Sequence, residues 1–350
     1  MTKAISYQAA LHHSRLIPED QLGTILAELE AEVGREQLNA AHLAKRILRD
    51  KLITPWQHSM LAAGRYQNFY YGKYKLLRYL TSGVSTIFLA IHEGMNRKVA
   101  VKILPVDRNT DASHLERFVR ECQFLASMDH PNIIRAHDID VEKDNQYYMI
   151  LDFVDGLDLE KFVADRGPLP CKTAVNYARQ TAEGLAHAHE HGLVHRDVKP
   201  ANLMLDKEGV VKILDLGMAR VTQEQAAEEQ EDAASVTLLR GEILGTADYV
   251  APEQVLDSHH VDNRADVYSL GCTLYYFLTG RPPYADCASM AQKLLAHHRE
   301  SPPRIKEQRE DVPPELEAIV YRMMAKDVEQ RCQSMIDVIA ELDQALAAAN

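Results

Sequence analysis

The first 72 residues carry the hydrophobic pattern of helices. Apolar side chains recur at three- and four-residue spacing over residues 22–33, and a second such pattern holds Leu43 and Ile47. This spacing places the apolar side chains on one face of a helix. We therefore predict a helical N-terminal region over residues 1–72.

The stretch "TPWQ" predicts the start of a third helix in this region. Thr54 can cap the helix, Pro55 fits its first turn, and Gln57 completes a capping box. Gly64 is suited to end it. We expect Trp56, the only tryptophan of the chain, to be a packing anchor.

From Tyr74 onward the pattern changes to that of strands. The stretches "YKLLRYL", "TIFLAIHE" and "KVAVKILP" are rich in β-branched and aromatic residues and predict three antiparallel strands. A helix is expected over 113–128, followed by strands over 133–140 and 146–153. Beyond Leu169 the periodicity is mainly helical through to Ala349. The pattern predicts an α+β protein with a small β-rich unit, a larger α-rich unit and a cleft between them.

Composition narrows the function classes. The formal net charge of −12 disfavours nucleic acid as a partner, because such binding relies on basic patches. No apolar run approaches the roughly 18 residues of a membrane span, and the first residues lack the apolar core of a signal peptide. The five cysteines are scattered, which is typical of a reducing compartment. We therefore expect a cytoplasmic protein.

The stretch "LVHRDVKPANLML" (193–205) is the strongest chemical signal. Its apolar ends predict buried strand pieces, yet polar side chains interrupt it, and packing alone does not explain them. Asp197 and Asn202 lie in this stretch, Asp215 follows it, and Lys102 stands far upstream in "VAVKIL". Two carboxylates, an amide and a lysine can together hold Mg²⁺ and phosphate.

These motifs resemble the eukaryotic-like (Hanks-type) Ser/Thr protein kinases, particularly the bacterial ones, over residues 74–345. The resemblance implies a bilobal kinase fold, with an N-lobe over 74–153 and a C-lobe over 154–345. It also implies ATP and Mg²⁺ as cofactors and a protein as substrate.

The catalytic roles follow from the same resemblance. Lys102 would anchor the nucleotide, and Glu121 would pair with Lys102. Asp197 would accept or orient the substrate hydroxyl proton, while Lys199 would steady the moving phosphoryl group. The metal ligands it implies are Asn202 and Asp215. Lys199 also follows the Ser/Thr rather than the Tyr pattern of the family.

The segment "GTADYVAPEQ" resembles the end of the activation segment, here 215–253. The resemblance places Thr246 beside the catalytic loop, pairs Glu253 with Arg331, and makes Asp266 a brace of that loop. Arg196 precedes the catalytic aspartate, and arginine pairs well with phosphate, so we expect regulation by a phosphorylated loop residue. The candidates are Ser235, Thr237 and, less favoured because of its structural role, Thr246. The alternative is that these hydroxyls are solvated.

The nucleotide pocket is implied residue by residue. Each apolar member would also be satisfied as plain core. The resemblance puts Ile87 and Ala100 above the adenine, Met204 beneath it, Leu151 at the gatekeeper position, Asp152 and Val154 in the hinge, and Asp158 at the ribose.

The phosphate-covering loop departs from the family. Its pattern is G-x-G-x-x-G, whereas "TSGVSTIFLA" keeps Gly83 alone. Glycines allow backbone N–H groups to approach phosphate closely. Ser82 belongs to this loop as well. Thr81 and Ser85 would crowd that approach, although their hydroxyls could donate hydrogen bonds, so we expect weakened nucleotide binding.

Three functions are compatible with this pattern. The favoured one is an ATP- and Mg²⁺-dependent Ser/Thr protein kinase. The alternative is a pseudokinase that acts as a scaffold. A small-molecule phosphotransferase is disfavoured by "GTADYVAPEQ", which resembles a peptide-binding platform. The N-terminal helices either dock on the kinase domain or recruit a partner, and the protein substrate does not follow from the sequence.

Overall fold

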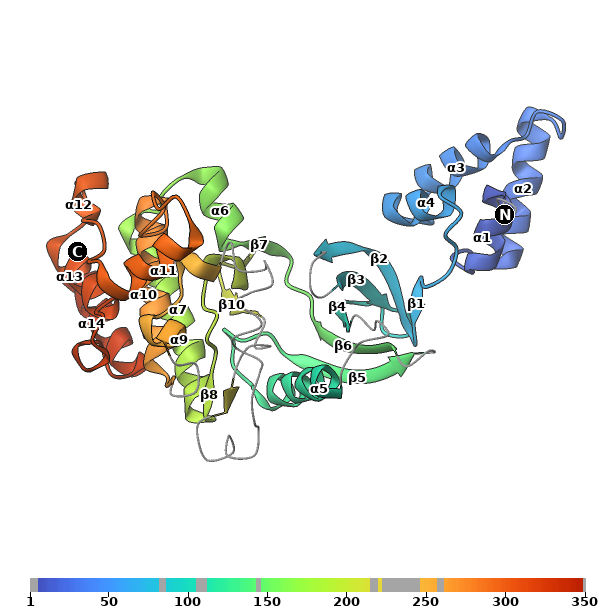
Figure 1. The fold of residues 1–350 in the computed structure, drawn as a ribbon. Coiled ribbons are helices and arrows are strands. Elements are labelled where there is room, and N and C mark those ends of the chain that lie inside the picture. Colours follow the sequence, from blue (N-terminus) through green and yellow to red (C-terminus); the bar gives the residue numbers. More distant parts are fainter. Residues whose placement is uncertain are drawn as a thin grey trace. The chain divides into compact units, whose positions relative to one another are not determined.

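The computed structural model describes residues 6–81, 86–104, 112–142, 146–214, 220–221, 246–256 and 261–348. The chain forms two compact units (Figure 1). The first contains residues 1–122 and 136–153, and the second contains residues 123–135 and 154–350.

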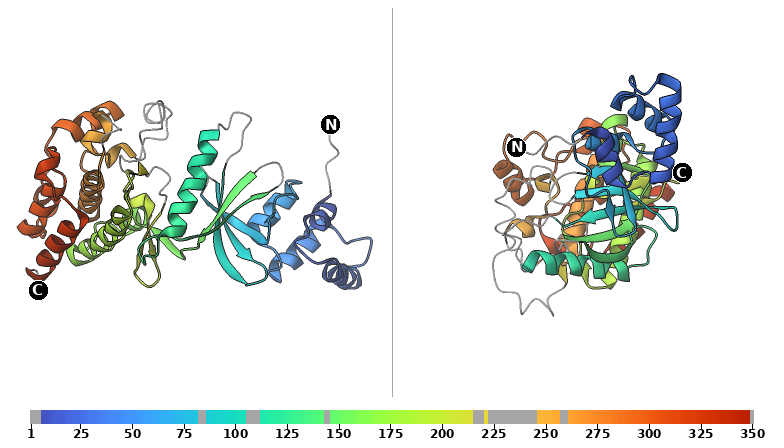
Figure 2. Two further views of the ribbon diagram at one scale, coloured as in Figure 1. Left: turned by 90° about the horizontal axis from the view of Figure 1, so that it is seen from below. Right: turned by 90° about the vertical axis from the view of Figure 1, so that its right-hand side faces the viewer.

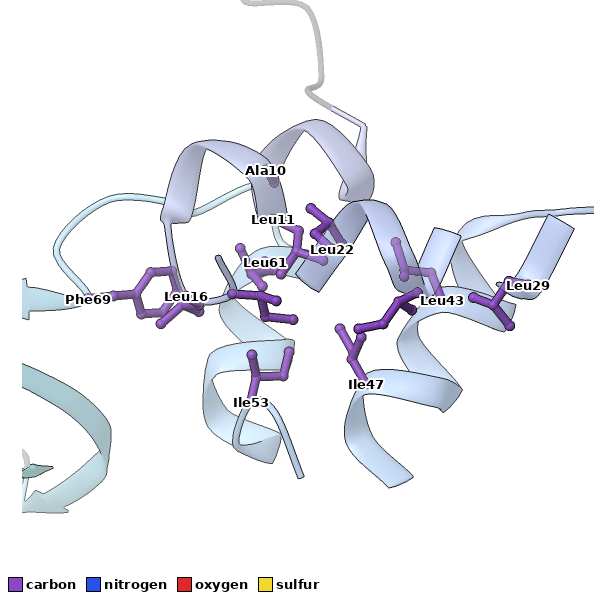
Figure 3. Packing of buried hydrophobic residues seen from close by; sticks show 12 residues of the cluster. Ala10, Leu11, Leu16, Leu22, Leu29, Leu43, Ile47, Ile53, Leu61 and Phe69 are labelled. Atoms are coloured by element: carbon purple, nitrogen blue, oxygen red, sulfur yellow. The ribbon is translucent and has the colours of Figure 1, made fainter. Parts of the chain in front are cut away.

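Four helices form the N-terminal part of the first unit: α1 (Tyr7–Ser14), α2 (Glu19–Val33), α3 (Ala40–Arg49) and α4 (Pro55–Ala62). The three predicted helices are confirmed as α2, α3 and α4, and the capping box of Thr54 and Gln57 is present. Helix α1 was not predicted. The four helices share a hydrophobic core, the helical cluster (Figure 3). Its buried members are Ala10, Leu11, Leu16, Ile17, Leu22, Ile25, Leu29, Leu43, Ile47, Ile53, Leu61 and Phe69.

The rest of the first unit is built on a six-stranded antiparallel sheet with the order β1-β2-β3-β4-β6-β5. The strands are β1 (Tyr70–Tyr71), β2 (Tyr74–Thr81), β3 (Thr86–His92), β4 (Arg97–Ile103), β5 (Ala136–Glu142) and β6 (Gln146–Asp152). All five predicted strands are present, and helix α5 (Ala112–Ser127) follows β4 as expected. The strand predicted at 133–140 starts later, because Ile133 instead forms an isolated parallel bridge with Ile213.

Side chains alternate between the two faces of this sheet. One face forms a buried core, the sheet cluster, whose members are Tyr71, Tyr74, Leu76, Phe88, Ala90, Val99, Val101, Ile103, Tyr148 and Ile150. The opposite face of β4 carries Ala100 and Lys102. The alternation therefore separates the hydrophobic core from the face to which the nucleotide-site residues were assigned.

The second unit is mainly helical. Its helices are α6 (Leu159–Arg166), α7 (Cys171–Glu190), α9 (Pro252–Leu256), α10 (Arg264–Thr279), α11 (Met290–Arg299), α12 (Ile305–Gln308), α13 (Pro314–Met323) and α14 (Met335–Ala348). Helix α10 is buried from Ala265 to Leu278 and packs against α7 and α13. Helices α7 and α14 lie side by side (Figure 2).

Short strands complete this unit: β7 (Gly156–Asp158), β8 (Leu193–Val194), β9 (Leu203–Asp206), β10 (Val211–Ile213) and β11 (Arg220–Val221). They form the sheets β10-β9-β7 and β11-β8.

All five cysteines are free thiols. In the part of the chain that the structure describes, no helix is long and apolar enough to cross a membrane.

Candidate active site

The stretch 193–205 begins with β8, continues through a loop and ends in β9, so its two apolar ends are strands, as predicted. Lys199 Nζ donates to both carboxylate oxygens of Asp197, at 2.9 and 2.8 Å. Asn202 Nδ2 donates to Asp197 Oδ2 at 2.9 Å and to the Asp197 carbonyl at 2.8 Å. Two of the side chains that the sequence motif placed within six residues, Lys199 and Asn202, therefore converge on the carboxylate of the third, Asp197.

The buried side chain of Asp266, near the start of α10, accepts hydrogen bonds from the backbone of this loop. Its Oδ2 accepts from the His195 amide and its Oδ1 from the Arg196 amide, each at 2.8 Å. His189 Nε2 lies 2.8 Å from Asp266 Oδ2, and Asp266 is fully buried. The brace expected of Asp266 is present as two backbone hydrogen bonds and an imidazole contact.

Burial by itself raises the pKa of the Asp266 carboxyl. The hydrogen bond and charge of His189, the charge of His195 and the Arg196 amide outweigh burial, so the pKa of Asp266 lies below its ordinary value. Asp266 is thus a carboxylate in the interior. The same contacts support a left-handed backbone at Arg196, where φ is 65°. A non-glycine residue adopts this conformation only when its surroundings impose it.

Two residues that follow the expected activation segment, Gln254 and Val261, contact Arg196 of the loop 193–205. Gln254 Nε2 donates to the Arg196 carbonyl at 2.9 Å, and Arg196 Nη2 donates to the Val261 carbonyl at 3.0 Å. Arg331 forms two hydrogen bonds with the Glu253 carboxylate, at 2.6 and 2.8 Å, so the predicted pairing is present.

Of the three hydroxyl residues named as phosphorylation candidates, only Thr246 is among the described residues. Thr246 opens the short 3-10 helix Thr246–Asp248. Ser235 and Thr237 lie outside the described residues.

Of the two predicted metal ligands, Asn202 lies in this loop. Asp215 lies outside the described residues, but the preceding amide, that of Leu214, donates to the Asn202 carbonyl at 2.8 Å. His195 Nε2 lies 3.0 Å from the Leu214 carbonyl. Because the Nδ2 group of Asn202 donates to Asp197, the amide oxygen is the atom with which Asn202 would bind a cation. Amide and carboxylate oxygens are ligands of the kind that Mg²⁺ prefers.

No group of three or more His, Cys, Asp and Glu side chains among the described residues is arranged to hold a metal ion. A magnesium ion at the predicted ligands Asn202 and Asp215 would take its remaining ligands from the nucleotide phosphates. This pattern of one or two protein ligands plus phosphates is usual for Mg²⁺.

In the first unit, Lys102 Nζ donates to Glu121 Oε1 at 2.7 Å. Each side chain is only 7% exposed, so the pair is buried. Ile87 lies opposite Lys102 in the β3–β4 register, and Ala100 lies opposite Leu151 in the β4–β6 register. Paired residues share one face of a sheet. The structure therefore brings the residues assigned to the adenine roof and gatekeeper to the same face as Lys102.

The remaining nucleotide-site residues divide between the two units. Asp152 ends β6, and Val154 follows it as a half-buried residue. Met204 lies opposite Asp158 in the β7–β9 register. The Asp158 carboxylate caps α6 by accepting from the Lys161 amide at 2.8 Å.

The phosphate-covering loop is described only at its border. Thr81 lies opposite Ile87 in the β2–β3 register. Ser82, Gly83 and Ser85 lie outside the described residues.

Sequence reasoning missed two groups that hold predicted site residues. Arg97 Nη2 and His137 Nε2 lie 2.8 and 2.7 Å from Asp152 Oδ1, next to the hinge. His189 and Gln254 hold Asp266 and Arg196. Position in the motif could have indicated Gln254, which follows Glu253, whereas the contacts of Asp152 depend on strand register.

Comparison with known proteins agrees with this geometry. The model of the protein kinase domain family matches residues 74–342. The serine/threonine-protein kinase PknB of Mycolicibacterium smegmatis is 37% identical over 263 residues, which are 74% of this chain and 40% of the relative. The serine/threonine-protein kinase PrkC of Bacillus subtilis is 34% identical over 279 residues, 79% of this chain and 41% of the relative. The chain thus spans about two fifths of the length of these curated relatives.

A solved structure confirms the fold. The crystal structure of a variant of the Mycobacterium tuberculosis PknI kinase domain matches with a TM-score of 0.59 and 26% identity, covering 79% of this chain and 97% of that one. The α+β kinase fold and the bacterial kinase resemblance predicted from the sequence are therefore confirmed. The chain belongs to the protein kinase family, in the group of bacterial Ser/Thr protein kinases.

Proposed function

We propose that the chain is a Ser/Thr protein kinase that transfers the γ-phosphoryl group of ATP to protein hydroxyls. The observation that carries the proposal is the convergence of Lys199 and Asn202 on the carboxylate of Asp197, within 3 Å. The transferred group passes through a loose and highly charged state, so catalysis consists mostly of positioning and charge compensation. A carboxylate beside a lysine and an amide supplies both.

The roles of the residues follow the family pattern. Asp197 accepts or orients the proton of the substrate hydroxyl, and Lys199 compensates the charge of the moving phosphoryl group. Lys102 anchors the nucleotide phosphates, and its ion pair with Glu121 restrains its flexible side chain.

Asn202 and Asp215 are the proposed Mg²⁺ ligands. When bound, Mg²⁺ would neutralise charge on the nucleotide phosphates.

We assign the adenine site to two surfaces. The roof and gatekeeper are Ile87, Ala100 and Leu151, which adjoin Lys102 on one sheet face. Met204 and Asp158, which are opposite each other in register, would contact the adenine and the ribose. Asp152 and Val154 would offer the hinge backbone groups. The loop 81–85 would cover the phosphates with a single glycine, so we expect weak ATP binding.

We place the kinase domain at 74–345, with a regulated activation segment at 215–253. Arg196 would receive a phosphate carried by Ser235 or Thr237, which would order this segment through a charge-assisted hydrogen bond. The substrates are proteins, and we propose autophosphorylation among them. A cytoplasmic location is supported by the five free thiols, which suit a reducing compartment.

Transfer of radiolabelled phosphate from ATP tests the proposal. We expect incorporation into the chain itself and into a general protein substrate, and its loss in Asp197→Asn. Equal incorporation in the wild type and the variant would defeat it. Binding of ATP without any transfer would establish the pseudokinase alternative. Mass spectrometry of the labelled chain identifies the modified hydroxyls and tests Ser235 and Thr237 in the same experiment.

A further inference from the structure

Helix α4 connects the N-terminal helices to the sheet. Trp56 packs against both the helical cluster and the sheet cluster. Through Leu61, α4 is part of the helical cluster, and the Tyr7 hydroxyl lies 2.8 Å from His58 Nδ1. Helix α4 therefore packs against the other N-terminal helices on one side and against the sheet on the other.

The capping box of α4 has two functions. Within the helix, Gln57 N donates to Thr54 Oγ1 at 3.1 Å, and Thr54 N donates to Gln57 Oε1 at 2.8 Å. The same two side chains also reach the sheet. Thr54 Oγ1 donates to the Leu77 carbonyl, and Gln57 Nε2 donates to the Leu76 carbonyl, each at 2.6 Å. Gln57 is 2% exposed, so its hydrogen bond is shielded from water.

The site of these hydrogen bonds is a bulge in β2. In the β2–β3 register Leu76 lies opposite Ala90 and Arg78 lies opposite Leu89, which leaves Leu77 without an opposite residue. A bulge leaves backbone groups outside the ladder of the sheet. Here α4 provides donors for two carbonyls of the bulge. The hydrogen bonds from the start of α4 thus depend on the bulge in β2.

Beyond the bulge, α4 contacts the end of the hairpin. The ring of Trp56 lies 5.3 Å from that of Tyr79 and 5.4 Å from that of Phe88. Tyr79 and Phe88 are opposite in register and stacked, with ring centroids 4.4 Å apart. The indole N–H of Trp56 is buried and has no hydrogen-bond partner among the described residues. Trp56 therefore contributes through packing against Tyr79 and Phe88, with the interaction energy typical of aromatic pairs.

The two strands held in this way flank the segment 82–85. On β3, Phe88 and Ile87 are consecutive, so their side chains point to opposite faces. Ile87 shares its face with Lys102, its partner in register. Trp56 thus contacts one face of β3, and the opposite face of β3 carries Ile87, which is assigned to the ATP site.

We propose that α4 is a positioning element of the nucleotide site. Through Trp56, Thr54 and Gln57 it fixes the β2–β3 hairpin, and so sets the affinity of the protein for Mg-ATP. The inference rests on the proposed function only in taking Lys102 and Ile87 as nucleotide-site residues. It gives the N-terminal helices a role within the kinase itself.

A double-mutant cycle on Trp56 and Tyr79 tests this role. The Kd for Mg-ATP is measured by calorimetry on the full chain, together with KM and kcat of phosphate transfer. We expect Trp56→Ala and Tyr79→Ala each to raise Kd and KM about 5- to 20-fold with little change in kcat, a coupling of ordinary size. The double variant should be no weaker than the weaker single variant, because both remove the same contact.

Two further variants separate positioning from general damage. Trp56→Phe should restore Kd to within about twofold, because the lost indole N–H made no hydrogen bond. Tyr66→Ala truncates a half-buried aromatic residue of the helical cluster that lies against His13, and it should leave Kd unchanged. Tyr79 is 43% exposed, so Tyr79→Ala is expected to fold even if Trp56→Ala does not.

The outcomes distinguish the two proposals. Unchanged Kd in Tyr79→Ala, or an equal rise in Tyr66→Ala, overturns the positioning role while phosphate transfer by the wild type leaves the kinase assignment intact. A wild type that binds Mg-ATP but transfers nothing overturns the kinase assignment, and the Kd cycle still decides the role of α4. A wild type without measurable Mg-ATP binding overturns both.

Discussion

Lys199 and Asp197 form a symmetric pair, in which the ammonium group contacts both carboxylate oxygens, at 2.9 and 2.8 Å. Their side chains are 18% and 12% exposed, so the pair is accessible to a substrate but partly shielded from water. A contact to both oxygens limits rotation of the carboxylate. It also leaves the positive charge beside the group that is proposed to receive the hydroxyl proton.

Loss of this charge should reduce turnover. We expect Lys199→Met to lower kcat about 100-fold, because charge compensation of the transferred group is lost. KM for ATP should change less than kcat, which initial rates over a range of ATP concentrations will show. Lys306→Met, at an exposed lysine of α12, is the matched control and should retain full activity. A kcat of Lys199→Met close to that of the control would contradict the assigned role.

The Lys102–Glu121 pair leads to a prediction about stability. Lys102→Met leaves the buried carboxylate of Glu121 without this ammonium group, so the free energy of unfolding should fall by about 3–5 kcal/mol. Adding Glu121→Leu removes the second charge and should restore most of the loss. Urea unfolding of the wild type, the single variant and the double variant measures this. A double variant less stable than Lys102→Met would rule out charge burial as the cause.

The lowered pKa of Asp266 predicts a dependence of stability on acidity. A carboxyl whose native pKa is depressed binds fewer protons in the native state than in the unfolded state, so stability rises with pH across its titration. The contribution of Asp266 is complete above the ordinary pKa, near 3.8, and is lost as the pH falls toward the native value. Unfolding measured between about pH 2 and 5 should show this loss in the wild type.

Asp266→Asn removes the titrating group and should flatten this part of the profile. It should also lower kcat, because an amide has one acceptor oxygen for the two backbone donors at His195 and Arg196. An unchanged acid profile in the variant would show that other carboxylates govern it.

Local patterns allowed much of the fold to be predicted. The first strands after Tyr74 are rich in β-branched and aromatic residues, and α4 begins with a capping box that is readable from four letters. Helix α1 escaped prediction because it has eight residues and buries only Ala10, Leu11 and Ser14, too few for a periodic signal. Short elements carry little information of their own and depend on tertiary packing.

The candidate site divides in the same way. Asp197, Lys199 and Asn202 are close in the chain, so a motif could place them together. The pairing of Lys102 with Glu121 needed the family resemblance. The hydrogen bonds of α4 to the β2 bulge, and the cluster at Asp152, depend on strand register and on a shift of one residue within it. Neither is encoded in a local pattern, because register is a property of two strands together.

The Glu253–Arg331 pair provides the last prediction. Arg331 is fully buried as a side chain, holds the Glu253 carboxylate with two hydrogen bonds, and also donates to the Ala325 carbonyl at 2.7 Å. A lysine has one compact ammonium group and cannot reproduce the planar fork. Arg331→Lys should therefore lower the free energy of unfolding by about 2–4 kcal/mol despite the retained charge.

The matched control is Arg322→Lys, in an ion pair with Glu341 where the arginine is 50% exposed. Exposed pairs contribute about 0–1 kcal/mol, so this change should be nearly silent. Thermal and urea unfolding of both variants measures the difference. Since Glu253 adjoins Gln254, which donates to the Arg196 carbonyl, kcat should also fall in Arg331→Lys at temperatures where the protein remains folded. Equal stability of the two variants would mean that the bidentate geometry at Glu253 contributes no more than an ordinary surface charge.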